Sequence, residues 1–179
     1  MAAAALLVGA NVDAQTPREE SQIKAAFVYN FLKFVEWPAE VFHRPDEPLV
    51  VAIVGAGPTA EATEQFLATK QVGERRILVR RVGWDEPLAG VHAVFVTEGD
   101  VKKLRHVLAA ASARPILSIG EGESFASSGG LIGLVIEERK VRFDIDMAVA
   151  DATGLKVSSK LLALTRVVHP AKDKMGDRR

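Results

Sequence analysis

The chain has 179 residues, 23 basic and 23 acidic side chains, and no cysteine. The balanced charge gives no indication of nucleic acid or another charged polymer as a partner. The absence of cysteine excludes disulfides, thiolate zinc sites and thiol nucleophiles, so stability must come from packing, with which 48% hydrophobic residues are consistent.

The first fourteen residues have the pattern of an export signal. An apolar run from Ala2 to Ala10 is followed by small residues at the minus-three and minus-one positions, Val12 and Ala14. The run is too short to span a bilayer, and no Lys or Arg precedes it. We expect residues 1–14 to be a signal peptide cleaved after Ala14 and the protein to act in the periplasm, where nucleotide cofactors are scarce.

Residues 15–170 are expected to form one α/β domain, followed by a polar, flexible tail over 171–179. The segment Thr16-Pro17-Arg18-Glu19 fits a capping box with proline at the first helical position. Phenylalanines then recur at helical spacing. The helix should end near Pro38, because the residue before a proline is driven out of the helical conformation.

The middle of the chain alternates between strands and helices. Apolar, often β-branched runs predict strands over 49–54, 77–82, 91–96 and 115–119, and helical spacing predicts helices over 59–68 and 101–111. This alternation indicates βαβ units. We therefore expect a three-layer α/β sandwich in which helices flank both faces of a mostly parallel sheet.

A C-terminal β-hairpin is predicted next, with strands over 131–136 and 140–145 joined by a charged turn over 137–139. In its second strand, Arg142, Asp144 and Asp146 alternate with apolar residues, which predicts one dry and one solvated face.

Two closing helices complete the predicted domain. Asp146 is expected to cap a short helix that runs through Ala152 and ends at Gly154. A final helix should begin at Ser158 or Ser159 and run to Val168.

One glycine-rich turn suggests a ligand. Gly55-Ala56-Gly57-Pro58 follows a buried strand and resembles the phosphate-binding turn of dinucleotide-binding folds. Arg80 and Arg81 stand where an acidic residue would bind the ribose, which leaves an NADP-binding oxidoreductase as an alternative hypothesis. A strand-to-helix turn needs small residues in any case, so we favour a structural role.

The remaining polar groups do not form a catalytic constellation. The loop over 120–124 carries two carboxylates that would repel phosphate, and we interpret it as a plain surface turn. For Asp144 and Asp146 we favour a solvated strand face and a helix cap over acid–base chemistry or cation binding. The four histidines lack metal-ligand spacing. We predict no enzymatic activity, no cofactor and no metal.

Three ordered blocks of the chain resemble the YfiR-like family of periplasmic proteins. They are the opening helix from Lys24 to Pro38, the segment from Val72 to Ile77, and the closing region from Ser128 to Leu162. The residues that carry the likeness most clearly in the first and last blocks are Phe27, Asn30, Trp37, Pro38, Gly129, Gly130, Phe143, Ser158, Ser159 and Leu162.

The resemblance implies a dimeric, non-enzymatic repressor. Such a protein restrains an inner-membrane diguanylate cyclase by binding its periplasmic sensor segment, so that cyclic di-GMP and biofilm formation respond to the cell envelope. Several family members carry cysteines that couple regulation to oxidation. This chain has none, so disulfide-based sensing cannot operate here.

Exposed charges and tryptophans are the candidate contacts for such a partner. We expect the solvated face of the last hairpin and its neighbours in sequence to supply them, and for Trp37 we prefer a packing role. The candidates are Arg142, Asp144, Asp146, Lys156, Lys160 and Trp84. A periplasmic sensor of a small ligand, without a protein partner, is a further alternative.

Overall fold

The computed structural model describes residues 16–97 and 101–170. The export signal predicted over 1–14 and the tail predicted over 171–179 lie outside these residues.

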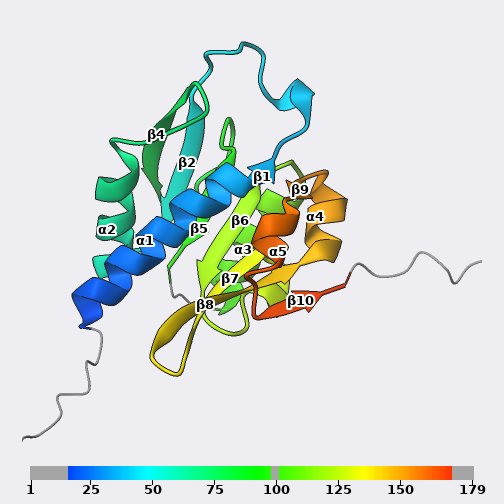
Figure 1. Ribbon diagram of the computed structural model, residues 1–179. Helices are drawn as coiled ribbons and strands as arrows, with labels where there is room; N and C mark the ends of the chain where they lie inside the picture. The colour runs from blue at the N-terminus through cyan, green and yellow to red at the C-terminus, as the bar shows by residue number, and fades with distance from the viewer. Residues whose placement is uncertain (1–15, 98–100, 171–179) are drawn as a thin grey trace, which may run out of the picture.

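An eight-stranded sheet forms the middle layer (Figure 1). Five strands run parallel, whereas β8 is antiparallel to β7 and β3 is antiparallel to β4. This confirms the mostly parallel sheet. The spatial order is β10 (Val167–His169), β8 (Lys140–Asp146), β7 (Ile132–Glu137), β6 (Leu117–Glu121), β5 (Ala93–Val96), β2 (Leu49–Val54), β4 (Arg75–Val82) and β3 (Gln71–Val72).

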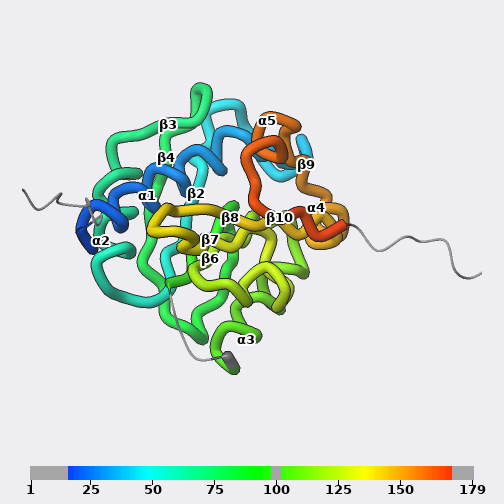
Figure 2. Tube along the Cα trace, turned by 60° about the horizontal axis from the view of Figure 1, so that its bottom comes forward, coloured from blue at the N-terminus to red at the C-terminus, as the bar shows by residue number. Residues whose placement is uncertain are grey.

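Helices cover both faces of the sheet, which confirms the three-layer sandwich. Figure 2 shows α1 (Pro17–Phe34) and α2 (Pro58–Leu67) on one side of the strands and α3 (Val101–Ser112) on the other. Short 3-10 helices, η1 (Ala39–Val41) and η2 (Ala126–Ser128), lie in two of the connections.

Two short helices close the domain beside β8 and β10, α4 (Met147–Thr153) and α5 (Ser159–Leu162). Between them, β9 (Lys156–Val157) pairs with β1 (Val35–Glu36) in a small antiparallel sheet. This pairing was not predicted, because strands of two residues leave no periodicity to detect.

The predicted start of α1 is confirmed in detail. The Thr16 hydroxyl accepts a hydrogen bond from the Glu19 amide at 3.3 Å, and the Glu19 carboxylate accepts one from the Thr16 amide at 2.8 Å. The two side chains thereby satisfy backbone donors that the helix leaves unpaired at its first turn.

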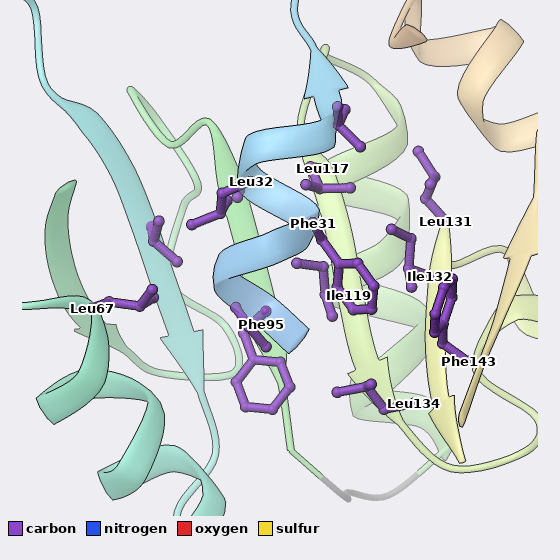
Figure 3. Packing of buried hydrophobic residues seen from close by; sticks show 14 of the residues in the cluster. Phe31, Leu32, Leu67, Phe95, Leu117, Ile119, Leu131, Ile132, Leu134 and Phe143 are labelled. Atoms are coloured by element: carbon purple, nitrogen blue, oxygen red, sulfur yellow. The ribbon is translucent and has the colours of Figure 1, made fainter. Parts of the chain in front are cut away.

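The larger part of the core lies between α1 and the sheet (Figure 3). Phe31 is fully buried and meets the ring of Phe143 edge to face, with 5.0 Å between centroids. Phe27 packs against the same ring at 5.7 Å. Aromatic rings contribute large buried areas in such contacts, so packing onto β8 is one anchor of helix α1, which also packs along α2.

The predicted hairpin and helix cap are also confirmed. Glu138 and Arg139 form a two-residue turn with φ of 49° and 61°, a left-handed conformation that usually favours glycine or asparagine. The Asp146 carboxylate accepts hydrogen bonds from the amides of Ala148 and Val149 at 2.9 and 3.4 Å, and Gly154 ends α4 with φ of 72°.

The final helix predicted through Val168 is wrong. Helix α5 ends at Leu162, and Val167–His169 instead forms β10, which runs parallel to β8. The carbonyl of Phe143 accepts hydrogen bonds from the Arg166 amide at 2.9 Å and the Thr165 hydroxyl at 3.0 Å. Strand β8 needs hydrogen-bond partners along its free edge, and the β-branched pair Val167-Val168 fits there.

Candidate functional site

The predicted solvated face of β8 contains one buried carboxylate. Arg142 is exposed and Asp146 is half-buried at its helix cap, but Asp144 is only 3% exposed. Two nitrogens of Arg166 bind its carboxylate at 2.9 and 2.6 Å. The prediction of a fully solvated face is therefore wrong at Asp144, because a cation 22 residues away in the sequence covers it.

This bidentate pair links β8 to the segment that leads into β10. The hydrogen bonds that Arg166 donates to Asp144, with a further contribution from Glu137, raise the pKa of Arg166 above its ordinary value. Reversing the charge of Asp144 would leave Arg166 facing another cation, so we expect Asp144→Arg to destabilise the protein rather than leave its stability unchanged.

The other candidate contacts lie on separate elements. Lys156 in β9 stands opposite Glu36 of β1, and Lys160 lies on α5; both are exposed. Trp84 follows β4, which is separated from β8 by four strands of the sheet. The fold therefore distributes Arg142, the two lysines and Trp84 over three places rather than onto one hairpin face.

Trp37 lies in a packed aromatic group at the end of α1. Its indole nitrogen donates a hydrogen bond to the His92 carbonyl at 3.0 Å, and its ring meets Phe42 edge to face at 6.3 Å. Pro38 lies next to Gly154, where an added Cβ would be 3.4 Å from the proline ring. These contacts agree with the preference for packing at Trp37.

The remaining residues that carry the family likeness have varied surroundings. Asn30 is exposed on α1, and Gly129 ends η2 in the left-handed conformation with φ of 100°. The Ser158 hydroxyl caps α5 by accepting a hydrogen bond from the Lys160 amide at 3.2 Å. Ser159 is exposed, and Leu162 packs against the core.

Gly120 and Gly130 enclose the ring of Phe125. A Cβ atom at Gly120 would come within 2.0 Å of that ring, and one at Gly130 within 2.1 Å. Phe125 itself is 1% exposed. The segment over 120–124 is therefore not wholly the plain surface turn that the sequence suggested, since Gly120 lies in β6 and forms one wall of a slot for an aromatic ring.

The last residue of β6, Glu121, takes part in a largely buried ion pair. Glu121 binds the ammonium group of Lys24 on α1 at 2.7 Å, and Glu20 binds it at 2.6 Å. Burial alone lowers the pKa of Lys24, but the hydrogen bonds and charges of Glu121 and Glu20 outweigh it and raise the pKa. The carboxylates thus keep Lys24 charged, and the pair holds α1 to the end of β6.

His92 is a second buried ionisable group, and its pKa is shifted in the opposite direction to that of Lys24. Its ring stacks on Phe42 with 4.6 Å between centroids, and its Nδ1 accepts a hydrogen bond from the Val50 amide at 3.0 Å. Burial lowers the pKa of His92, an effect that Glu47 opposes and the nearby Arg75 reinforces. The neutral imidazole is the form that this site stabilises.

The Gly55 turn has a packing explanation. With φ of +96°, Gly55 adopts a conformation that side chains disfavour, and an added Cβ would come within 2.0 Å of the Thr97 hydroxyl. Arg81 donates a hydrogen bond to the Gly55 carbonyl at 2.8 Å, and Arg80 lies 3.6 Å from Glu86. Packing thus explains the glycine of this turn without a bound nucleotide, and the structure gives that alternative no support.

The described residues include neither a metal-ligand cluster nor a membrane-spanning helix. Within 16–97 and 101–170, no three His, Cys, Asp or Glu side chains are grouped as metal ligands would be. No helix in these ranges combines the length and apolar character needed to cross a membrane.

The fold is similar to solved structures of low sequence identity. One is an ABC domain in complex with L-Trp from Streptococcus pneumonia, with a TM-score of 0.56 and 11% identity. Another is a conserved domain protein from Vibrio cholerae O1 biovar El Tor, with a TM-score of 0.59 and 9% identity. In both cases 83% of this chain is covered, and it spans 60% of the length of the solved chain.

A family model provides the more specific relationship. The model described as YfiR/HmsC-like matches residues 21–166, from the first helix to the arginine that pairs with Asp144. The match confirms the resemblance found in the three sequence blocks. The chain belongs to the YfiR/HmsC-like family, whose members are periplasmic regulators of diguanylate cyclases.

Proposed function

We propose that this protein binds the periplasmic sensor segment of an inner-membrane diguanylate cyclase and holds the enzyme inactive. The observation that carries the proposal is the family match over residues 21–166. The protein itself catalyses no reaction in this scheme and needs no cofactor. Export by the segment over 1–14 brings it to the partner.

A rigid domain regulates a membrane sensor by binding one of the sensor's conformations better than the other. A preference of ~1–3 kcal/mol shifts such an equilibrium enough to act as a switch. The packing of α1 onto β8 and the ion pair between Lys24 and Glu121 support this role, since both hold the domain in one shape. We propose that the protein works as a homodimer, which sedimentation of the purified chain would test.

The exposed cations Arg142, Lys156 and Lys160 remain our candidates for partner contact, with Trp84 as the candidate aromatic anchor. Asp144 contributes indirectly, by holding Arg166. Arg142→Glu should weaken capture of the cyclase segment while leaving the melting temperature nearly unchanged. Arg114→Glu, which reverses an exposed charge after α3, is the matched control.

The test in cells measures cyclic di-GMP in a strain that lacks the protein. We expect the level to rise several-fold and to return to normal on complementation with the full chain. A chain without residues 1–14 should fail to complement, because it cannot reach the partner. Unchanged cyclic di-GMP in the deletion strain would contradict the proposed function.

A further inference from the structure

One edge of the central sheet is incompletely paired. Strand β3 pairs with β4 only at Val72–Arg75 and Gln71–Arg76, whereas β4 continues to Val82. From Ile77 onward, β4 has a neighbouring strand on one side only, β2.

The register identifies the backbone groups that face outward. The Ile77 amide donates a hydrogen bond to the Lys70 carbonyl at 3.2 Å, on the side away from β2. Because backbone groups alternate in direction along a strand in a parallel pair, the amides and carbonyls of Val79 and Arg81 face the same way. In the part of the chain that the structure describes, no strand or turn hydrogen bond occupies them.

Apolar surface is exposed beside these groups. Leu78 is 50% exposed, on the same face of β4 as Arg76 and Arg80. A cavity of about 450 Å³ lies next to it, and Pro48, Ala68 and Ile77 contribute to its apolar wall. An extended chain laid along β4 would place a side chain in this cavity.

The charge of this edge is positive. Lys70 and Arg76 are the charged residues that line the cavity, and Arg80 and Arg81 follow on the strand. The nearest acids are held loosely, at 3.6 Å between Arg80 and Glu86 and 3.8 Å between Arg81 and Glu64, with all four side chains more than a third exposed. Such exposed pairs contribute little free energy, so a partner's carboxylates can replace them.

We propose that the edge of β4 from Leu78 to Val82 is a docking edge for an extended acidic segment of a protein partner, which adds to the sheet as a further strand. Backbone hydrogen bonds to Val79 and Arg81 supply affinity, and the row of cations selects carboxylates. Only the identity of the protein that provides the segment rests on the proposed function. A second copy of this edge is a poor occupant, because like charges on paired strands repel.

The probe is a fluorescein-labelled peptide of alternating Glu and Val. It is added to the protein from which only the predicted signal peptide, residues 1–14, has been removed. We expect saturable binding that weakens as salt is added, and about tenfold weaker binding of the matched peptide with Lys in place of Glu. Hydrogen exchange of the Val79 and Arg81 amides should slow when the acidic peptide is bound.

Two variants test the edge separately. Val79→Pro removes an outward amide without removing a hydrogen bond to β2, and Arg76→Glu with Arg80→Glu reverses the charge. Each should weaken peptide binding about tenfold or more, whereas Arg114→Glu after α3 should not. The double charge variant changes only exposed or half-exposed side chains, so it tests the proposal even if the proline variant unfolds.

If the acidic peptide binds, three outcomes would overturn the inference. The first is that the Lys peptide binds as tightly as the Glu peptide. The second is that bound peptide slows hydrogen exchange in β10 rather than in β4. The third is that the protein binds vesicles of anionic lipid, that Arg76→Glu abolishes this binding, and that the Val79 amide is not protected from hydrogen exchange. Failure of the peptide to bind, in a protein that still represses cyclic di-GMP, removes this docking edge but not the proposed function. Peptide binding without any cyclic di-GMP response removes the function but not the edge.

Discussion

Two glycine-containing segments lie at the carboxyl ends of parallel strands, 55–58 after β2 and 120–124 at the end of β6, and they differ in what the first glycine of each contacts. The segment after β2 has the more suggestive sequence, yet an added Cβ at Gly55 would meet the hydroxyl of a small side chain, Thr97, at 2.0 Å, and Gly57 has open space around it. The segment over 120–124 looked unremarkable, yet an added Cβ at Gly120 would meet a buried phenylalanine ring at the same distance, and Glu121 binds a buried lysine. A glycine motif by itself does not distinguish a ligand-binding turn from close packing, whereas the surroundings of each Cα do.

The largest effect should come from filling the slot around Phe125. Gly120→Ala forces a methyl group into the ring, because its Cβ would lie 2.0 Å from a ring atom. We expect a loss of about 3 kcal/mol or more in the free energy of unfolding, measured by urea denaturation. Phe125→Leu should recover part of the loss in the double variant. Gly83→Ala, where the nearest atom is 4.0 Å away, is the control and should be nearly neutral.

Breaking the ion pair between Lys24 and Glu121 should have the next largest effect on the free energy of unfolding. Lys24→Met leaves Glu121 largely buried without its cation, with its side chain 12% exposed. Because an unpaired buried charge is costly, we expect a loss of about 2–3 kcal/mol, reduced from the fully buried case by the remaining solvent contact. The exposed Lys33→Met on the same helix should change stability far less; equal losses for both variants would contradict the assigned role of Glu121.

The loop after β2 should respond more weakly. Gly55→Ala and Gly57→Ala both place a side chain at positive φ, 96° and 106°, which costs about 1–2 kcal/mol. We expect the larger loss at Gly55, where Thr97 must also move. NADPH should not raise the melting temperature of the unaltered protein; a concentration-dependent rise would reverse our interpretation of this loop.

The smallest expected effect is the pH dependence of stability, in which the two buried ionisable groups, Lys24 and His92, differ. Lys24 keeps its charge through its carboxylate partners, whereas burial lowers the pKa of His92. The unfolded chain therefore binds more protons below about pH 6.5, the ordinary histidine pKa, so stability should fall as the pH decreases from that value. The slope from one such group is at most about 1.4 kcal/mol per pH unit.

Denaturation of His92→Asn across pH 5–8 checks this prediction. Asparagine retains an acceptor for the Val50 amide, so the variant should lose the part of the pH dependence that comes from the imidazole. His106→Asn on the exposed face of α3 controls for the loss of a histidine elsewhere. If His92→Asn shows the same acid dependence as the unaltered protein, the assigned role of His92 is wrong.

Local chemistry made several elements predictable. The capping box at Thr16 and Glu19, the cap at Asp146 and the left-handed stop at Gly154 each act within a few residues, and each is confirmed. Strand β2 has the predicted bounds, because a β-branched run between turn residues has few alternatives. The family was equally accessible, since it depends on residues in order along the chain.

The sequence alone therefore determined the alternation of strands and helices, the sandwich and the family, because these follow from periodicity, turn chemistry and the order of motifs. Only the tertiary structure decided which polar residues are buried and which edges stay open. Arg166 reaches Asp144 across 22 residues and Lys24 reaches Glu121 across 97. No local pattern encodes such pairs, because their free energy depends on burial that exists only once the strands and helices have assembled.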